Sequence, residues 1–317
     1  MGLIEPASHL SEEAQQFLAD FVALPPLDPT DLEAVETARR MSLANWVSLN
    51  EGLEGPWISR PSTIAGVPVV TFAADEQALG AEQVMVHLHG GAFVLGSPTA
   101  SAALAVGVAQ RTGVPVVSVD YRLAPEHRCP AGLTDIVNVC LKVLASRRLA
   151  AIYGESAGAN LSLAAAVSLR DRGAMLPDRL GLLSPWVDLT CSGDTYRTLS
   201  STDPVLGTLD PPAFAAAYAG SDTASPEASP LFADLAGLPP ALIQTGSREL
   251  LLSDSCRLEA VLRRAGVPVE LSVWDGLWHG WQLRHHLAEA REALDELAVF
   301  LTGSRSQLPP KRAIDSQ

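Results

Sequence analysis

Short apolar runs alternate with longer helical stretches from Val67 onward, and this alternation constrains the fold more than any other feature. The strand candidates read VPVVTF, VMVHLH, VPVVSVDY, LAAIYG, LGLLS, PALIQTG and PVELSVW. Strands that alternate with helices form parallel sheets with crossover helices. Continuous apolar strands such as VMVHLH are typical of a sheet that is buried on both faces. We therefore predict an α/β chain with a doubly wound parallel sheet.

Two segments do not follow this alternation. Residues 1–56 read as helices interrupted by LPPLDP, and residues 190–237 carry five prolines. We predict that residues 1–56 form an N-terminal helical cap segment and that residues 57–302 form the α/β domain, with a cap insertion at about 190–237. The last stretch, 303–317, lacks apolar periodicity and is predicted to be a disordered tail.

Charge and composition exclude several classes of protein. The net charge is −14 and the basic residues are scattered, so we expect no nucleic-acid partner. The four cysteines show neither the close pairing of a zinc site nor the density of a disulfide scaffold. There is no signal-like N-terminus and no apolar run long enough to span a bilayer. We expect a cytoplasmic protein with no membrane span.

Ser156 lies between two glycines in IYGESAGANLSL, where a strand-like run gives way to an alanine-rich helical one. Glycines at 154 and 158 would allow a cramped, strained turn. GESAG matches the G-x-S-x-G nucleophile elbow, in which a strand-to-helix turn exposes a serine at the N-terminus of a helix. The alternative is a packing turn without chemistry.

A serine nucleophile needs a base that is itself oriented by a carboxylate. His279, in the glycine-bounded loop WDGLWHGW, follows Ser156 in the chain and is the candidate base; the alternative is a polar surface histidine. The segment SRELLLSDS offers Glu249 and Asp254 as the acid. We favour Glu249, directly past a strand, because Asp254 is placed to begin a helix and interact with its free amides.

A tetrahedral intermediate also needs backbone donors for its oxyanion. The stretch HLHGGAFVLGS leads a strand into a glycine pair upstream of the elbow. We predict that the amides of Gly90, Gly91 and Ala157 form a three-donor oxyanion hole, the alternative being a plain β-turn. His89 is interpreted as a residue that organises this loop by hydrogen bonding.

The blocks HLHGGAFVLGS, VSVDYRLAPEHRCPAGLTD, YGESAGANLS, LLSPWVDLT, SRELLLSDSCRLEAVLRRAG and WDGLWHGW resemble the bacterial hormone-sensitive-lipase-like esterases of the α/β-hydrolase superfamily. The resemblance implies a mostly parallel eight-stranded sheet flanked by helices, with a helical cap, and makes residues 57–302 an α/β-hydrolase catalytic domain. It also implies the same nucleophile, base and oxyanion donors. The family's acid is usually an aspartate, so Glu249 departs from the pattern, as does Glu155 in the elbow.

The expected function is hydrolysis of small or short-acyl carboxylic esters through an acyl-serine intermediate, with neither metal nor organic cofactor. The alternatives are a lactone hydrolase of the same fold and a non-catalytic small-molecule receptor that uses the hydrolase pocket. Phe93, Trp46, Trp186 and Phe214 are the expected lining of the substrate pocket. A homodimer is a family-level expectation.

Overall fold

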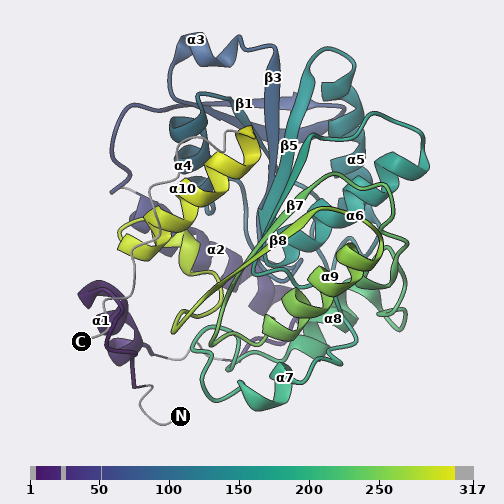
Figure 1. Ribbon diagram of the computed structural model, residues 1–317. Helices are drawn as coiled ribbons and strands as arrows, with labels where there is room; N and C mark the ends of the chain where they lie inside the picture. The colour runs from purple at the N-terminus through teal and green to yellow at the C-terminus, as the bar shows by residue number, and fades with distance from the viewer. Residues whose placement is uncertain (1–4, 23–25, 51, 304–317) are drawn as a thin grey trace.

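The computed structural model describes residues 5–22, 26–50 and 52–303, so the predicted tail lies almost entirely outside the described residues (Figure 1). The helices are α1 Glu12–Asp20, α2 Leu32–Asn50, α3 Glu76–Leu79, α4 Ala102–Thr112, α5 Ala131–Leu144, α6 Ala157–Asp171, α7 Thr195–Thr198, α8 Pro211–Ala219, α9 Leu252–Arg264 and α10 Ala288–Thr302, with 3-10 turns η1 Pro230–Phe232 and η2 Trp281–Leu283. The strands are β1 Ile58–Ile64, β2 Val67–Ala73, β3 Gln83–Leu88, β4 Val116–Val119, β5 Arg148–Glu155, β6 Arg179–Leu183, β7 Ala241–Gly246 and β8 Val269–Trp274. None of the described helices combines the length and apolar character that crossing a bilayer requires.

The eight strands form one sheet in the order β1-β2-β4-β3-β5-β6-β7-β8. Strand β2 pairs antiparallel with β1 and β4, whereas every pairing from β4 to β8 is parallel. The predicted mostly parallel eight-stranded sheet is therefore confirmed, and all seven strand candidates are strands. Strand β1 was not predicted, because its sequence ISRPSTI is largely exposed and contains Pro61.

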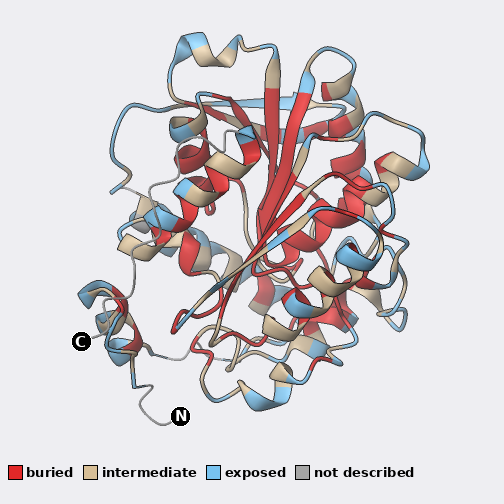
Figure 2. Cartoon of the chain, viewed as in Figure 1, coloured by how far each residue is buried: buried red, intermediate tan, exposed pale blue. Residues whose placement is uncertain are grey.

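Helices cover both faces of the sheet (Figure 1). Helices α5, α6 and α9 contribute to one apolar cluster, and α4 and α10 contribute to the other. Successive side chains of β3 alternate between them, since Val84 and Val86 belong to the first cluster and Met85 to the second. The central strands are buried along most of their length (Figure 2). This rigid sheet presents the loops at its carboxyl edge.

The two segments that interrupt the alternation meet the C-terminal part of the chain. The backbone amide and hydroxyl of Ser11 donate to Glu289 on α10 at 2.7 and 2.8 Å. The ring of Phe17 on α1 stacks on Trp278 at 4.3 Å. Trp278 belongs to a third apolar cluster, and Val205, from the proline-rich segment, packs against that cluster. The first segment therefore contacts the loop that carries His279, and the second packs against a cluster to which that loop contributes.

Candidate active site

Ser156 occupies a sharp turn between the end of β5 and the start of α6. Its backbone has φ 57° and ψ −119°, a conformation that L residues rarely adopt. A Cβ atom on Gly158 would lie 1.9 Å from the carbonyl oxygen of Leu88, and one on Gly154 would lie 2.4 Å from it. The glycines on either side of the serine are thus required, because the end of β3 packs directly against the turn.

The imidazole of His279 lies against the Ser156 hydroxyl. The distance from Nε2 to Oγ is 2.9 Å, and the two residues are only 7% and 9% exposed. His279 reaches this position from the loop after β8, while Ser156 comes from the loop after β5. At this distance the ring can accept the hydroxyl proton as a general base.

Glu249 faces the other nitrogen of the His279 ring. Its Oε2 atom is 3.7 Å from Nδ1, and Nδ1 has no hydrogen-bond partner in the described part of the chain. The fully buried carboxylate instead accepts a hydrogen bond from Ser184 Oγ at 2.7 Å and a short one from Thr245 Oγ1. Contacts of this kind are often long in unliganded enzymes and tighten when substrate binds.

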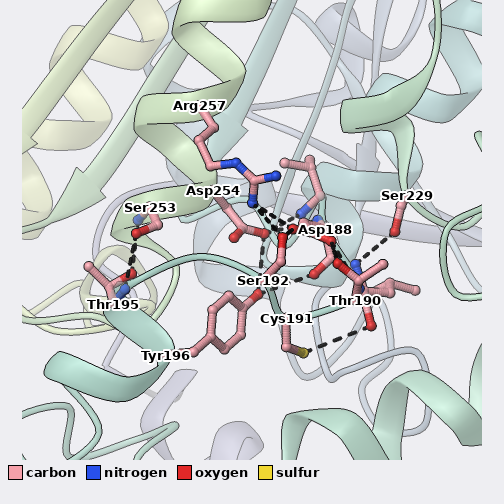
Figure 3. A network of polar contacts seen from close by, with 12 residues as sticks. Asp188, Thr190, Cys191, Ser192, Thr195, Tyr196, Ser229, Ser253, Asp254 and Arg257 are labelled. Carbon is pink, nitrogen blue, oxygen red and sulfur yellow. Dashed lines mark hydrogen bonds and ion pairs between the residues drawn. The ribbon is translucent and has the colours of Figure 1, made fainter.

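Asp254, the other candidate acid, lies in a separate polar network (Figure 3). Its Oδ2 atom accepts hydrogen bonds from the amides of Val187 and Asp188 at 3.0 and 2.9 Å. Arg257 forms an ion pair with Asp188 at 2.5 Å. Burial raises the pKa of Asp254 to about 8, and the Asp188 charge adds to this. Asp254 braces the loop after β6, and Glu249 is the carboxylate that faces His279.

The structure corrects the prediction that the Gly90 amide is an oxyanion donor. That amide donates to Oε1 of Glu155 at 2.7 Å. The same carboxylate accepts hydrogen bonds from Ser101 Oγ at 2.8 Å and His87 Nε2 at 3.0 Å. Burial raises the pKa of Glu155, but these hydrogen bonds and the His87 ring lower it overall. Glu155, which precedes Ser156 in the sequence, therefore holds the glycine loop.

The amides of Gly91, Ala92 and Ala157 have no hydrogen-bond partner within the described ranges. Gly91 has φ +115°, and a Cβ there would lie 2.3 Å from the Leu95 carbonyl oxygen. Ala92 has φ +52°. The pattern HGGAF indicates the glycine pair and does not indicate Ala92. The one available signal was a third small residue directly after that pair.

His89 lies beneath the glycine loop. Its Nδ1 atom is 2.8 Å from the Gly90 carbonyl oxygen, and its ring stacks on Tyr121 at 4.3 Å. Burial lowers the pKa of His89 to about 4, so the ring is neutral and organises the loop. Across the residues described, no three His, Cys, Asp or Glu side chains gather in a group that could hold a metal ion.

Three of the four predicted pocket residues are buried aromatics. Phe93 follows the glycine loop with φ +63°, stacks on Tyr218 at 3.9 Å and lies 5.6 Å from Trp186. Phe214 is buried in the same apolar cluster. Trp46, on α2, is instead placed 5.9 Å from the guanidinium of Arg284.

Known proteins resemble this chain along most of its length. A protein family with the alpha/beta hydrolase fold matches residues 85–283 of this chain. An esterase of Acinetobacter venetianus is 37% identical over 249 residues, which cover 77% of this chain and 81% of that protein. An acetyl-hydrolase of Streptomyces hygroscopicus is 38% identical over 224 residues, 69% of this chain and 75% of that protein. The crystal structure of an esterase from the bacterial hormone-sensitive lipase family superposes with a TM-score of 0.80 at 34% identity, covering 85% and 91% of the two chains.

Proposed function

Since the chain belongs to the hormone-sensitive-lipase-like esterases of the α/β-hydrolase fold and is a carboxylesterase-type hydrolase, we propose that Ser156, His279 and Glu249 are its catalytic triad. We further propose that it cleaves small, short-acyl esters through an acyl-serine intermediate. The observation that carries the proposal is the 2.9 Å contact between Ser156 Oγ and His279 Nε2 on a strained elbow.

The reaction follows from the positions of these groups. Ser156 Oγ attacks the ester carbonyl carbon while His279 Nε2 takes the hydroxyl proton. The tetrahedral intermediate expels the alcohol, which receives that proton from His279, and the acyl group remains on Oγ. A water molecule then attacks the acyl carbon, with His279 again as base, and the acid and free serine are released. Glu249 orients the ring and stabilises its positive charge.

The oxyanion is bound by the amides of Gly91, Ala92 and Ala157 in this proposal. Each has no partner in the described chain and lies in the glycine loop or at the N-terminus of α6. Donors that are fixed before the reaction lower the barrier because they need no reorganisation. Gly90 contributes indirectly, since its amide anchors the loop to Glu155.

A short acyl group is supported by the aromatic residues next to the glycine loop. The rings of Trp186 and Tyr218 both pack against Phe93, and all three residues are nearly fully buried, so we infer that an acyl group bound beside them is short. The relative from Streptomyces hygroscopicus is named for acetyl hydrolysis. We propose that esters with acyl groups of two to about four carbons are preferred.

We also propose that residues 1–56 and 190–237 form a cap over the site. Arg39 on α2 supports this, because its guanidinium donates to the carbonyl oxygens of Val94 and Ala124, both at 2.8 Å, and pairs with Glu126. The stack of Phe17 on Trp278 joins α1 to the residue before the base.

The test is the initial rate on p-nitrophenyl esters from acetate to dodecanoate, for wild type and for Ser156→Ala. We expect wild type to be fastest on the shortest esters and the variant to lose at least about a thousandfold in kcat. Equal rates for both proteins would overturn the assignment of the nucleophile.

A panel of lactones, run with the same two proteins, distinguishes an open-chain esterase from a lactone hydrolase. Labelling by an organophosphate separates an active hydrolase from a receptor, because only an activated serine is phosphorylated. The matched control is Ser162→Ala, since Ser162 is also buried on α6 but its hydroxyl donates to the Gly158 carbonyl. It should keep wild-type labelling.

A further inference from the structure

A second buried carboxylate, Asp203, lies next to the turn that carries Glu249. It belongs to the proline-rich segment 190–237 and is fully buried. Among the described residues no arginine or lysine forms an ion pair with it. Its oxygens accept from three backbone amides, those of Val205, Leu206 and Leu250, at 2.9, 3.0 and 2.9 Å. A buried, unpaired carboxylate is costly to keep, so its retention calls for an explanation.

One of those amides belongs to the residue directly after Glu249. The Leu250 amide donates to Asp203 Oδ2, and the Leu250 carbonyl accepts from Thr195 Oγ1 at 2.5 Å. The peptide groups on both sides of Leu250 are therefore held by the segment 195–203. This matters because Glu249 makes no closed hydrogen bond to His279 that would hold it in place.

The charges of both His279 and Glu249 affect the pKa of Asp203. Burial raises the pKa of Asp203 to about 6, against the lowering influence of the His279 ring and the amides of Leu206 and Leu250, while the Glu249 charge raises it further. The His279 ring is therefore one of the groups whose charge acts on the Asp203 carboxylate. Above that pH its negative charge favours the protonated ring.

We infer that Asp203 is a positioning residue for the proposed reaction, which holds the Glu249 turn and places a second negative charge toward the His279 imidazolium. The inference rests on the proposed triad. It explains how a triad with a long acid side chain and a 3.7 Å gap can stabilise the charge that forms on the ring. Asp203 is fully buried and acts through other groups, so we expect it to change kcat and not KM.

The experiment compares Asp203→Asn with wild type on p-nitrophenyl acetate between pH 5 and 9, normalised to active sites titrated with a fluorophosphonate. We expect kcat per titrated site to fall about tenfold with KM unchanged, and the acid limb of the kcat/KM profile to move to lower pH by about one unit, because a neutral side chain no longer favours the protonated ring. The matched control is Asp210→Asn, which removes an equal charge from an exposed position that caps α8. This control should leave kcat per titrated site and the position of the acid limb unchanged.

Should Asp203→Asn fail to fold, Asp203→Glu decides, since it keeps the charge but cannot hold the Leu250 amide at the same distance. A lowered kcat with the wild-type acid limb then supports the inference, and wild-type kcat overturns it. An Asp203→Asn enzyme whose kcat and pH profile match wild type also overturns it. If wild type itself turns over no ester, the proposed function fails first, and this failure is distinct from an active wild type that is indifferent to Asp203.

Discussion

The nucleophile side of the site is held by close backbone packing and one buried carboxylate, whereas the acid side is held by side-chain hydroxyls. On the nucleophile side, residues 87–101 and 154–160, glycines bring the end of β3 against the elbow and Glu155 anchors the Gly90 amide. On the acid side, residues 184–203 and 245–254, Glu249 is fixed by the hydroxyls of Ser184 and Thr245. The 3.7 Å gap to His279 lies on this second side.

This difference shows where the enzyme can tolerate change. At Gly154 and Gly158 a Cβ atom would lie only 2.4 and 1.9 Å from the Leu88 carbonyl oxygen, which leaves no room for adjustment, so the nucleophile side is rigid. Side-chain hydroxyls can rotate and be replaced, so the acid side can accommodate the longer side chain of a glutamate. Four predictions test this comparison.

The largest effect is expected from Gly158→Ala. The added carbon would lie 1.9 Å from the Leu88 carbonyl oxygen, and backbone must move to admit it. We expect the free energy of unfolding to fall by more than about 3 kcal/mol, with loss of activity. Urea unfolding measures this. Gly173→Ala is the control, because nothing lies within 4 Å of that position and only its φ of +67° is strained, at a cost of about 1 kcal/mol. Equal losses for the two variants would contradict a rigid elbow.

Removing the acid should have a smaller effect than in triads with a closed hydrogen bond. For Glu249→Gln we expect kcat on p-nitrophenyl acetate to fall about a hundredfold with KM little changed, below the roughly ten-thousandfold loss of a tightly bonded acid. Steady-state kinetics measure this. The control is Glu296→Gln, since Glu296 accepts from Gln244 Nε2 at 2.9 Å outside the site. A loss below about twofold would show that the acid side plays no part.

Removing the charge of Glu155, which anchors the glycine loop, should lower kcat less than removing the charge of Glu249. Glu155→Gln removes the charge that holds the Gly90 amide, and we expect kcat to fall about tenfold, because the proposed oxyanion donors themselves remain. Inhibition by a trifluoromethyl ketone, which forms a tetrahedral adduct, should weaken in the same proportion. Unchanged inhibition with a lowered kcat would place the effect of Glu155 outside the oxyanion hole.

The fourth prediction concerns the stability of the acid side and its dependence on pH. The folded protein holds a proton on Asp254 up to about pH 8, with Asp188, Arg257 and Tyr196 around it. The unfolded chain releases that proton near its ordinary pKa of 3.8, so stability falls as pH rises through this window, by at most about 1.4 kcal/mol per pH unit. Asp254→Asn should flatten the profile in urea unfolding at pH 5, 6.5 and 8. A profile parallel to wild type would assign the slope to other groups.

Much of the fold could be predicted because buried parallel strands have a strong sequence pattern. Each of the seven apolar runs became a strand, and the order of helices between them required a layered α/β architecture. The sequence did not indicate strand β1, because an edge strand buries few side chains and most residues of β1 are exposed. The antiparallel pairing of β2 with β4 could not be predicted from the sequence either, because it depends on which strands become neighbours in the folded sheet.

Within the site, local motifs predicted Ser156, and chain order indicated His279 and Glu249. The error at Gly90 and the omission of Ala92 have one cause: the direction of an amide depends on the backbone, which the pattern HGGAF does not determine. Asp203 was missed because STDPVLG reads as an ordinary turn, and its link to Leu250 joins positions 47 residues apart.

The bond between Ser11 and Glu289 joins residues 278 positions apart, and it has a consequence for the order in which the enzyme is completed. A ribosome releases α1 and α2 long before it has made the loop that carries His279 and helix α10. Helix α1 packs against both. Helix α1 therefore lacks its packing partners while the strands of the sheet are being synthesised. A nascent chain can therefore form the turn at Ser156 before the contact between Ser11 and Glu289, which needs residues that are made later.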